Sequence, residues 1–168
     1  MPAQTSALAP ASHPVMARAA SGDMPLAELL SQAQALQAAG DTAGAEALYA
    51  AWIAHSASPL QHVALFNRGT LLTALERRDE AIAVYLRAIE LDPGYPDALE
   101  DYAELLFMVG RVEESSRETE KLVKLDPLFI IAWVRMRDVV IAQDRRADIA
   151  RLTPMLRSTF PDSTLGWY

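Results

Sequence analysis

The sequence has no cysteine at any of its 168 positions. This absence excludes disulfide scaffolds, cysteine-ligated zinc and cysteine nucleophiles, and it suits a reducing compartment. In other respects the totals describe an ordinary globular chain, because 51% of the residues are hydrophobic and 22% are charged. A chain of this length and composition can bury a core of its own.

Long apolar runs are also missing. No stretch approaches the roughly 18 to 20 apolar residues that cross a bilayer, so we expect no membrane span. The segment 1–25 lacks the basic start and the continuous apolar core of a secretory signal, which favours a cytoplasmic location. It is rich in Ala, Pro and Ser, and its prolines leave little room for a helix. We therefore expect residues 1–25 to form a flexible tail.

Basic residues are in the minority, and the net charge of −7 argues against a duplex nucleic-acid partner. The charge is unevenly distributed along the chain. Residues 96–120 contain eight acidic residues and two arginines, whereas residues 130–157 contain six arginines and three aspartates. An acidic segment is thus followed by a basic one.

The usual catalytic and metal-binding patterns do not occur. The three histidines are His13, His55 and His62, and Pro59 separates the last two, so no pair has the spacing of metal ligands on one helix. The glycine-containing stretches "SGDMP" and "AAGDTAG" have no phosphate-loop lysine, and no Ser, His and Asp arrangement is apparent. We therefore predict no enzymatic activity, no cofactor and no metal site within these residues.

A repeat organises the chain. Pro93, Pro127 and Pro161 are equally spaced, and the first two follow Leu-Asp. The sequence can be written in rows that each span the interval between two of these prolines, so that equivalent positions fall in the same column. In one row, "HVALFNRGTLLTAL" and "EAIAVYLRAIEL" have apolar residues at helical spacing on either side of "ERRD". Each row therefore predicts two helices, and the rows are about 26–61, 62–95, 96–129 and 130–163. The fold class that follows is all-α.

The second row resembles the tetratricopeptide repeat, a family whose period is about 34 residues. The matching positions are Leu65, Gly69, Leu72, Ala81, Tyr85, Ala88 and Pro93. The resemblance covers about residues 26–163 and implies a right-handed α-solenoid of about four antiparallel helix pairs. In the first row, Gly40 is expected to mark the turn between the two helices.

Two rows depart from the family pattern. Ser115 and Thr119 stand in the third row where Ala and an aromatic residue are usual, which predicts a looser helix pair. Pro154 falls inside the second helix of the fourth row and is expected to kink it. Residues 164–168 begin a further helix or form a short cap, and Trp167 occupies the column that opens a helix pair. We expect from this that the natural protein continues.

The family resemblance also implies a function, because the first helix of each pair lines a groove that usually holds a protein or peptide segment. Carried over by position, the candidate groove residues are Phe66, Asn67, Thr70, Asp97, Glu100, Asp101, Glu104, Phe107, Arg135 and Asp138. The acidic members share one helical face and favour a basic partner, with the phenylalanines as apolar anchors. The competing interpretation is an ordinary solvated helix face.

Three further interpretations accompany the groove. Some family members clamp the C-terminal carboxylate of chaperones with Lys, Asn and Arg, but Phe66 and Thr70 stand where Lys and Asn would be needed, and only Asn67 matches. That ligand is therefore not expected. The first two rows also resemble the repeats of bacterial proteins similar to the O-linked N-acetylglucosamine transferases, which implies a substrate-recruiting region of a larger enzyme. Finally, the acidic 96–120 face and the basic 130–157 face are able to join copies of the chain into a homo-oligomer.

Overall fold

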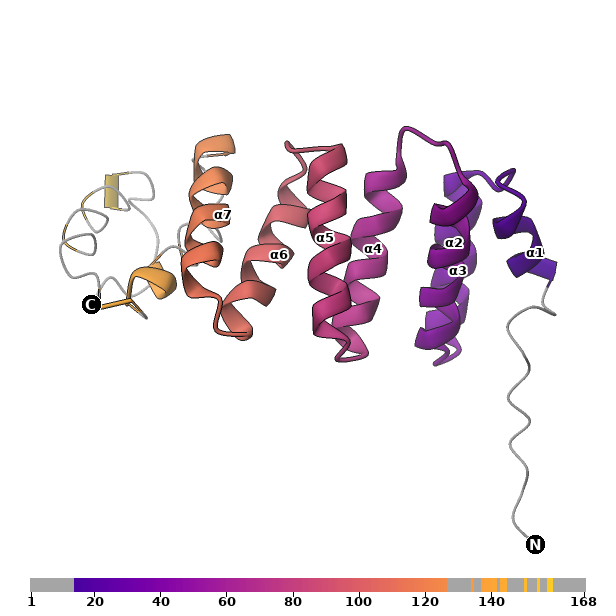
Figure 1. The fold of residues 1–168 in the computed structure, drawn as a ribbon, viewed down its shortest axis with the longest axis horizontal. Helices are drawn as coiled ribbons and strands as arrows, with labels where there is room; N and C mark the ends of the chain where they lie inside the picture. The colour runs from indigo at the N-terminus through magenta and orange to yellow at the C-terminus, as the bar shows by residue number, and fades with distance from the viewer. Residues whose placement is uncertain are drawn as a thin grey trace, which may run out of the picture. The chain divides into compact units, whose positions relative to one another are not determined.

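The structure is a computed structural model that describes residues 14–126 and, beyond them, residues 134, 137–141, 143, 144, 150, 154, 157 and 158. Its helices are α1 (Pro14–Ala20), α2 (Leu26–Ala38), α3 (Thr42–His55), α4 (Gln61–Ala74), α5 (Arg78–Leu91), α6 (Pro96–Met108) and α7 (Val112–Leu125). Two compact units divide the chain, residues 1–91 with α1–α5 and residues 92–168 with α6 and α7 (Figure 1). No strand occurs among the described residues, so the predicted all-α class is confirmed.

Successive helices form antiparallel pairs within each unit. In the first unit α2 packs against α3 and α4 packs against α5, and α3 also contacts α4; in the second unit α6 packs against α7 (Figure 1). The first three predicted rows each contain one such pair, apart from Gln61, which begins α4 one residue before its row. Most of the fourth row, with all of residues 164–168, lies outside the described residues. The kink expected at Pro154 and the continuation of the chain therefore stay predictions.

A residue with left-handed backbone conformation ends the first helix of each pair. Gly40, Glu76 and Gly110 have φ values of +82°, +58° and +82°, and Asp144 in the fourth row has +50°. After α2, α4 and α6, the residue that follows the left-handed one donates its backbone N–H to a carbonyl near the end of the helix. This is the Schellman arrangement. The predicted turn at Gly40 is therefore confirmed, and the same conformation recurs in every row.

The two helices of the second pair meet at Gly69. A Cβ atom added there would lie 2.6 Å from Cε1 of Tyr85, a separation that real contacts do not reach. Tyr85 is almost fully buried, and its ring occupies the space that the missing side chain leaves. The small column of the repeat is therefore required because the aromatic column packs directly over it.

The third pair fills the equivalent space with different residues. Ala103 takes the column of Gly69, and Ser115 and Thr119 take the columns of Ala81 and Tyr85. Both hydroxyl-bearing side chains are fully buried. The Ser115 hydroxyl donates to the Ala103 carbonyl of α6 at 2.7 Å, and the Thr119 hydroxyl donates to the Ser115 carbonyl at 2.8 Å. At these positions the pair is closed rather than loose, because each of these buried hydroxyls has a carbonyl partner.

The expected flexible tail is wrong for residues 14–20, which form α1 and pack against α3. Pro14 occupies the first helical position, where no backbone N–H is needed, so it starts the helix rather than preventing it. Ala19 is completely buried, and Val15 and Met16 pack against the same core cluster. Apolar contact with the first pair therefore orders a segment whose composition suggests disorder. Residues 1–13 lie outside the described residues.

Among the residues that the structure describes, no helix has the length and the apolar character to cross a bilayer.

Replacing Glu76 by glycine should stabilise the fold. The left-handed conformation costs a non-glycine residue roughly 1–2 kcal/mol, whereas the extra flexibility of glycine in the unfolded chain offsets about 0.5–1 kcal/mol of that gain. We expect Glu76→Gly to raise the free energy of unfolding by about 0.5–1 kcal/mol, measured by urea denaturation. Gly110→Ala is the reciprocal control and should lower it, because no neighbouring atom lies near the added methyl group and only backbone strain acts.

The contact between Gly69 and Tyr85 can be tested by a double-mutant cycle. Gly69→Ala should destabilise the protein by about 1–3 kcal/mol, because the added methyl group overlaps the Tyr85 ring. In a Tyr85→Thr background the same change should become stabilising by about 0.5–1 kcal/mol, because alanine is the better helix former. Equal destabilisation in both backgrounds, measured by chemical denaturation, would show that the ring is not the cause.

Candidate partner-binding faces

The first candidate face lies on α4 and has no charged side chain among its predicted members. Phe66 and Asn67 are half-buried and Thr70 is exposed. The Asn67 amide donates to the Val63 carbonyl at 2.8 Å, and the Thr70 hydroxyl donates to the Phe66 carbonyl at 3.3 Å. These polar groups therefore bond back to carbonyls of their own helix. The predicted members of this face form an uncharged surface.

An aromatic contact between α4 and α5 supports this face. The rings of Phe66 and Tyr85 lie 6.3 Å apart between centroids and are tilted by 46°. This separation and tilt are typical of favourable aromatic contacts. The Tyr85 hydroxyl also lies 3.3 Å from Thr70 Oγ1. The α5 helix thus fixes the orientation of Phe66, the apolar anchor that the sequence predicts.

The second candidate face lies on α6, in the other unit, and is acidic. Asp97 is exposed, and Glu100, Asp101 and Glu104 are half-buried. The helix buries the opposite side, with Leu99, Tyr102, Ala103, Leu105 and Leu106 almost completely covered. Phe107 is half-buried at the end of the acidic face, and its neighbour Met108 is 56% exposed. The face therefore combines four carboxylates with an apolar end.

The carboxylates act on a nearby tyrosine. The pKa of Tyr95 is raised, first by burial and then by the negative charges of Asp97, Asp101 and Asp92. Because a nearby negative charge disfavours a second one, the part of this pKa shift that comes from the carboxylates reflects a negative local potential at the start of α6. The same potential attracts cations and repels anions.

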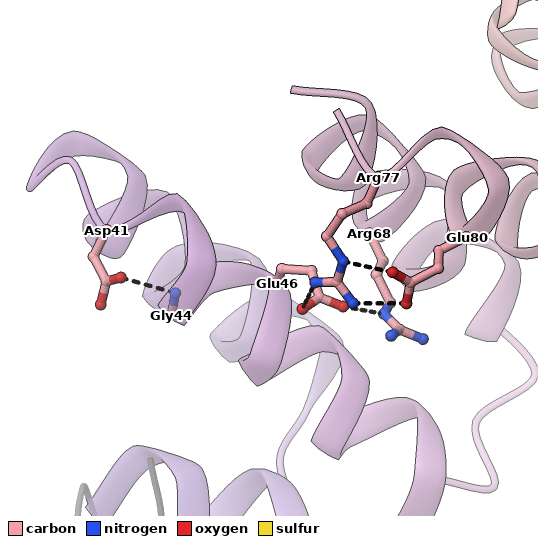
Figure 2. A network of polar contacts seen from close by, with 6 residues as sticks. All are labelled: Asp41, Gly44, Glu46, Arg68, Arg77 and Glu80. Atoms are coloured by element: carbon pink, nitrogen blue, oxygen red, sulfur yellow. Dashed lines mark hydrogen bonds and ion pairs between the residues drawn. The ribbon is translucent and has the colours of Figure 1, made fainter. Parts of the chain in front are cut away.

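An ion-pair network centred on the buried carboxylate of Glu46 positions α4. Glu46 of α3 has a side chain only 8% exposed, and it accepts from Arg68 Nε of α4 at 2.7 Å and from Arg77 Nη1 at 3.0 Å (Figure 2). Arg77 precedes α5 and also donates to both oxygens of Glu80, each at 2.6 Å. One carboxylate thus ties α3 to α4 and to the turn before α5.

The network shifts the ionisation of its outer members. The pKa of Arg77 is raised, chiefly by its hydrogen bonds to Glu80 and with a further contribution from Glu46. The pKa of Glu80 is lowered, first by the hydrogen bond from Arg77. Both shifts favour the charged forms, so Arg77 and Glu80 are ionised near neutral pH.

The other predicted site residues belong to the fourth row. Asp138 is half-buried and accepts from Arg137 Nη2 at 2.9 Å, so its charge has a neighbouring partner. Arg135 lies outside the described residues, as does most of the basic 130–157 segment. Within the described part of the chain, no three His, Cys, Asp or Glu residues are grouped as metal ligands.

Comparison with known proteins identifies the repeat. Two sequence profiles, each described as tetratricopeptide repeat, match residues 30–96 and 72–136. Together they span more than half of the 168 residues. The chain belongs to the tetratricopeptide repeat family.

Individual relatives agree with this assignment. The "Protein STIP1 homolog" of Dictyostelium discoideum is 32% identical over 69 residues, which cover 41% of this chain and only 12% of that protein. A tetratricopeptide repeat protein from Parabacteroides merdae superposes with a TM-score of 0.76 at 21% identity, over 82% of this chain and 54% of the other. The first repeat domain of Spaghetti (RPAP3), solved with the HSP90 peptide SRMEEVD, gives 0.62 at 20% identity, over 69% and 93%. The structural likeness shows a shared fold.

The tetratricopeptide signature did not reveal the Glu46 network. Its members are 22 and 31 residues apart in sequence, and none occupies a signature column. One signal was available, because Glu46 is the only acidic residue in the otherwise apolar "TAGAEALYAAWIAH" of α3. A lone acid in such a helix requires a cationic partner from elsewhere in the fold.

Removing the Glu46 carboxylate should weaken the junction of the first two repeats. Glu46→Gln leaves the partly exposed Arg68 and Arg77 without their shared anion, and we expect a loss of about 1–3 kcal/mol in the free energy of unfolding by urea denaturation at neutral pH. The matched control is Glu90→Gln, which breaks the exposed Arg87–Glu90 pair and should cost less than about 1 kcal/mol. If both variants lose a similar, small free energy of unfolding, the Glu46 network has no special structural role.

Proposed function

We propose that the chain is a non-catalytic protein-interaction module whose α6 face holds a basic segment of a partner protein. The observation that carries the proposal is the clustering of Asp97, Glu100, Asp101 and Glu104 on the solvent side of α6, with Phe107 at the end of the row. A partner segment with Lys or Arg near an apolar residue matches this arrangement, because opposite charges steer the encounter and the apolar contact holds it.

The tetratricopeptide fold supports the interaction role. The Spaghetti domain with this fold was solved with a bound HSP90 peptide, so a domain of this kind can hold a peptide. That peptide, SRMEEVD, is acidic towards its end. The α6 face of this chain has the opposite preference, since its carboxylates repel an acidic peptide. The α4 face offers Asn67 but no lysine or arginine among its predicted members, so a chaperone carboxylate has no cationic clamp there.

The other interpretations of the sequence stay predictions. A substrate-recruiting role in a larger glycosyltransferase and association through the 96–120 and 130–157 segments are both compatible with the fold. No described contact favours either of them. A cytoplasmic location and the absence of catalytic activity likewise stay predictions.

Charge reversal on α6 tests the proposal. The probe is a short fluorescein-labelled peptide of Lys, Arg and Leu, and its binding is followed by fluorescence anisotropy at low and at high salt. Glu100→Lys combined with Glu104→Lys should weaken binding at least about tenfold, because it replaces two attractive charges with repulsive ones. High salt should reduce the affinity of the unaltered protein, because ions screen exposed charges.

A second pair of reversals provides the control. Glu113→Lys combined with Glu120→Lys changes the net charge equally but acts on α7 of the same unit. This control should retain most of the affinity if the α6 face is the binding surface. If both double variants lose the same affinity for the peptide, net charge alone explains the effect. If the α6 variant keeps its affinity, the acidic residues of α6 form an ordinary solvated surface. Circular dichroism of both variants confirms that the helices remain.

A further inference from the structure

The last residue of α6, Met108, exposes a thioether side chain to solvent. It is 56% exposed, which is more than any other large apolar residue in the described part of the chain. By contrast, Leu105 and Leu106 of the same helical turn are almost completely buried. The core between α6 and α7 therefore uses the two leucines and leaves Met108 accessible.

Helical spacing places Met108 on the acidic face of α6. Successive residues of an α-helix are rotated by about 100°, so residues four and seven apart share one side of the helix. Met108 follows Glu104 by four residues and Asp101 by seven, and it lies on the same side as both carboxylates. Phe107, the apolar anchor that the sequence predicts, lies towards Glu100 and is half-buried. Met108 is thus the more accessible apolar group of this face.

The sulfur of Met108 is also the most accessible oxidisable sulfur in the described part of the chain. The sequence has no cysteine, so no thiol within these residues competes for an oxidant. Two other methionines lie among the described residues. Met24 is 3% exposed, and Met16 is half-buried and packs against the core cluster. Because oxidation of a sulfur atom requires access from solvent, a dissolved oxidant reaches Met108 before the other two.

The oxidation is a transfer of one oxygen atom from hydrogen peroxide. A lone pair of the Met108 sulfur attacks one peroxide oxygen, the O–O bond breaks, and the departing hydroxide removes the proton from the transferred oxygen and leaves as water. The sulfur loses two electrons and becomes a sulfoxide, and the peroxide is reduced. Hydrogen peroxide is uncharged at neutral pH, so the carboxylates of the α6 face do not repel it. Methionine sulfoxide reductases reverse the change.

We infer that Met108 is an oxidation site that regulates the α6 face, which presupposes the partner binding proposed above. In the reduced state, the flexible thioether packs against an apolar residue of the basic partner segment. In the oxidised state the side chain is polar, and covering its sulfoxide oxygen with an apolar group carries a desolvation cost. Oxidation therefore lowers the affinity for the partner, whereas the charges of the four carboxylates remain unchanged.

Peptide mapping by mass spectrometry tests the site itself. The full chain is treated with dilute hydrogen peroxide at neutral pH, catalase stops the reaction, and the sulfoxide content of each methionine is followed over time. Met108 should be oxidised at least about tenfold faster than Met24, because only Met108 is open to solvent. Equal rates at the two positions would overturn the inference, since exposure would then not select Met108.

Peptide binding before and after oxidation tests the regulation. The probe is the fluorescein-labelled peptide of Lys, Arg and Leu, and oxidation should weaken its binding about fivefold, because an apolar contact is lost. Treatment of the oxidised protein with methionine sulfoxide reductases should restore the affinity. Met108→Leu has no sulfur at this position, so peroxide should leave its affinity at the starting value. Met16→Leu is the matched control in the other unit, and it should still lose affinity about fivefold on oxidation.

The possible outcomes separate this inference from the proposed function. A protein that does not bind the peptide before treatment overturns the proposed function and the regulation together. Binding that is equally tight or tighter after complete oxidation of Met108 overturns the regulation and leaves the proposed function intact. An equal loss in Met108→Leu would assign the effect to another oxidised residue and would overturn the inference. So would an equal loss for a probe peptide with Ser in place of Leu, because that peptide has no apolar contact to lose.

Discussion

The left-handed residue after the first helix of each pair is the constraint on which the repeat depends. Gly40, Glu76, Gly110 and Asp144 occupy the same position in successive rows, and all have positive φ. This conformation reverses the chain within a short turn, so the second helix returns antiparallel against the first. The conformation, rather than glycine itself, is what recurs, since Glu76 and Asp144 adopt it despite their side chains.

Close packing of the paired helices follows from that tight turn. Where the turn brings the helices together, the total volume of the facing side chains has to match the space available. The second pair meets this requirement with no side chain at Gly69 and a large ring at Tyr85. The third pair meets it with Ala103 and the smaller Thr119. The hydroxyl groups of Ser115 and Thr119 donate hydrogen bonds to backbone carbonyls of the same pair. Different residues can therefore serve the same repeat, provided that volume and hydrogen bonding are both maintained across the pair.

Much of this architecture could be predicted from the sequence, because it depends on local periodicity. The helix pairs, the turn at Gly40 and the small column at Gly69 all leave a regular signal. The helix α1 left a misleading one, since its flanking prolines suggest disorder and its stability comes from tertiary contact with α3. The acidic face of α6 was also predictable, because residues three and four apart share one side of a helix. Neither periodicity nor position specifies what a face binds, which is decided by the chemistry of the partner.

The Glu46 network shows why long-range contacts leave no periodic signal in the sequence and why the fold retains them. The first repeat is slightly longer than the second, so the regular period alone does not set the register of α4 against α3. A buried ion pair adds little net stability compared with apolar packing, but a displaced helix would leave its carboxylate without partners, at a cost of several kcal/mol. Gln61 adds a second tie, because its side-chain amide donates to the Ile53 carbonyl near the end of α3 at 3.2 Å. Charge and hydrogen bonding therefore specify the junction where the repeat is irregular, and they hold α4, with its Phe66 face, in a defined position.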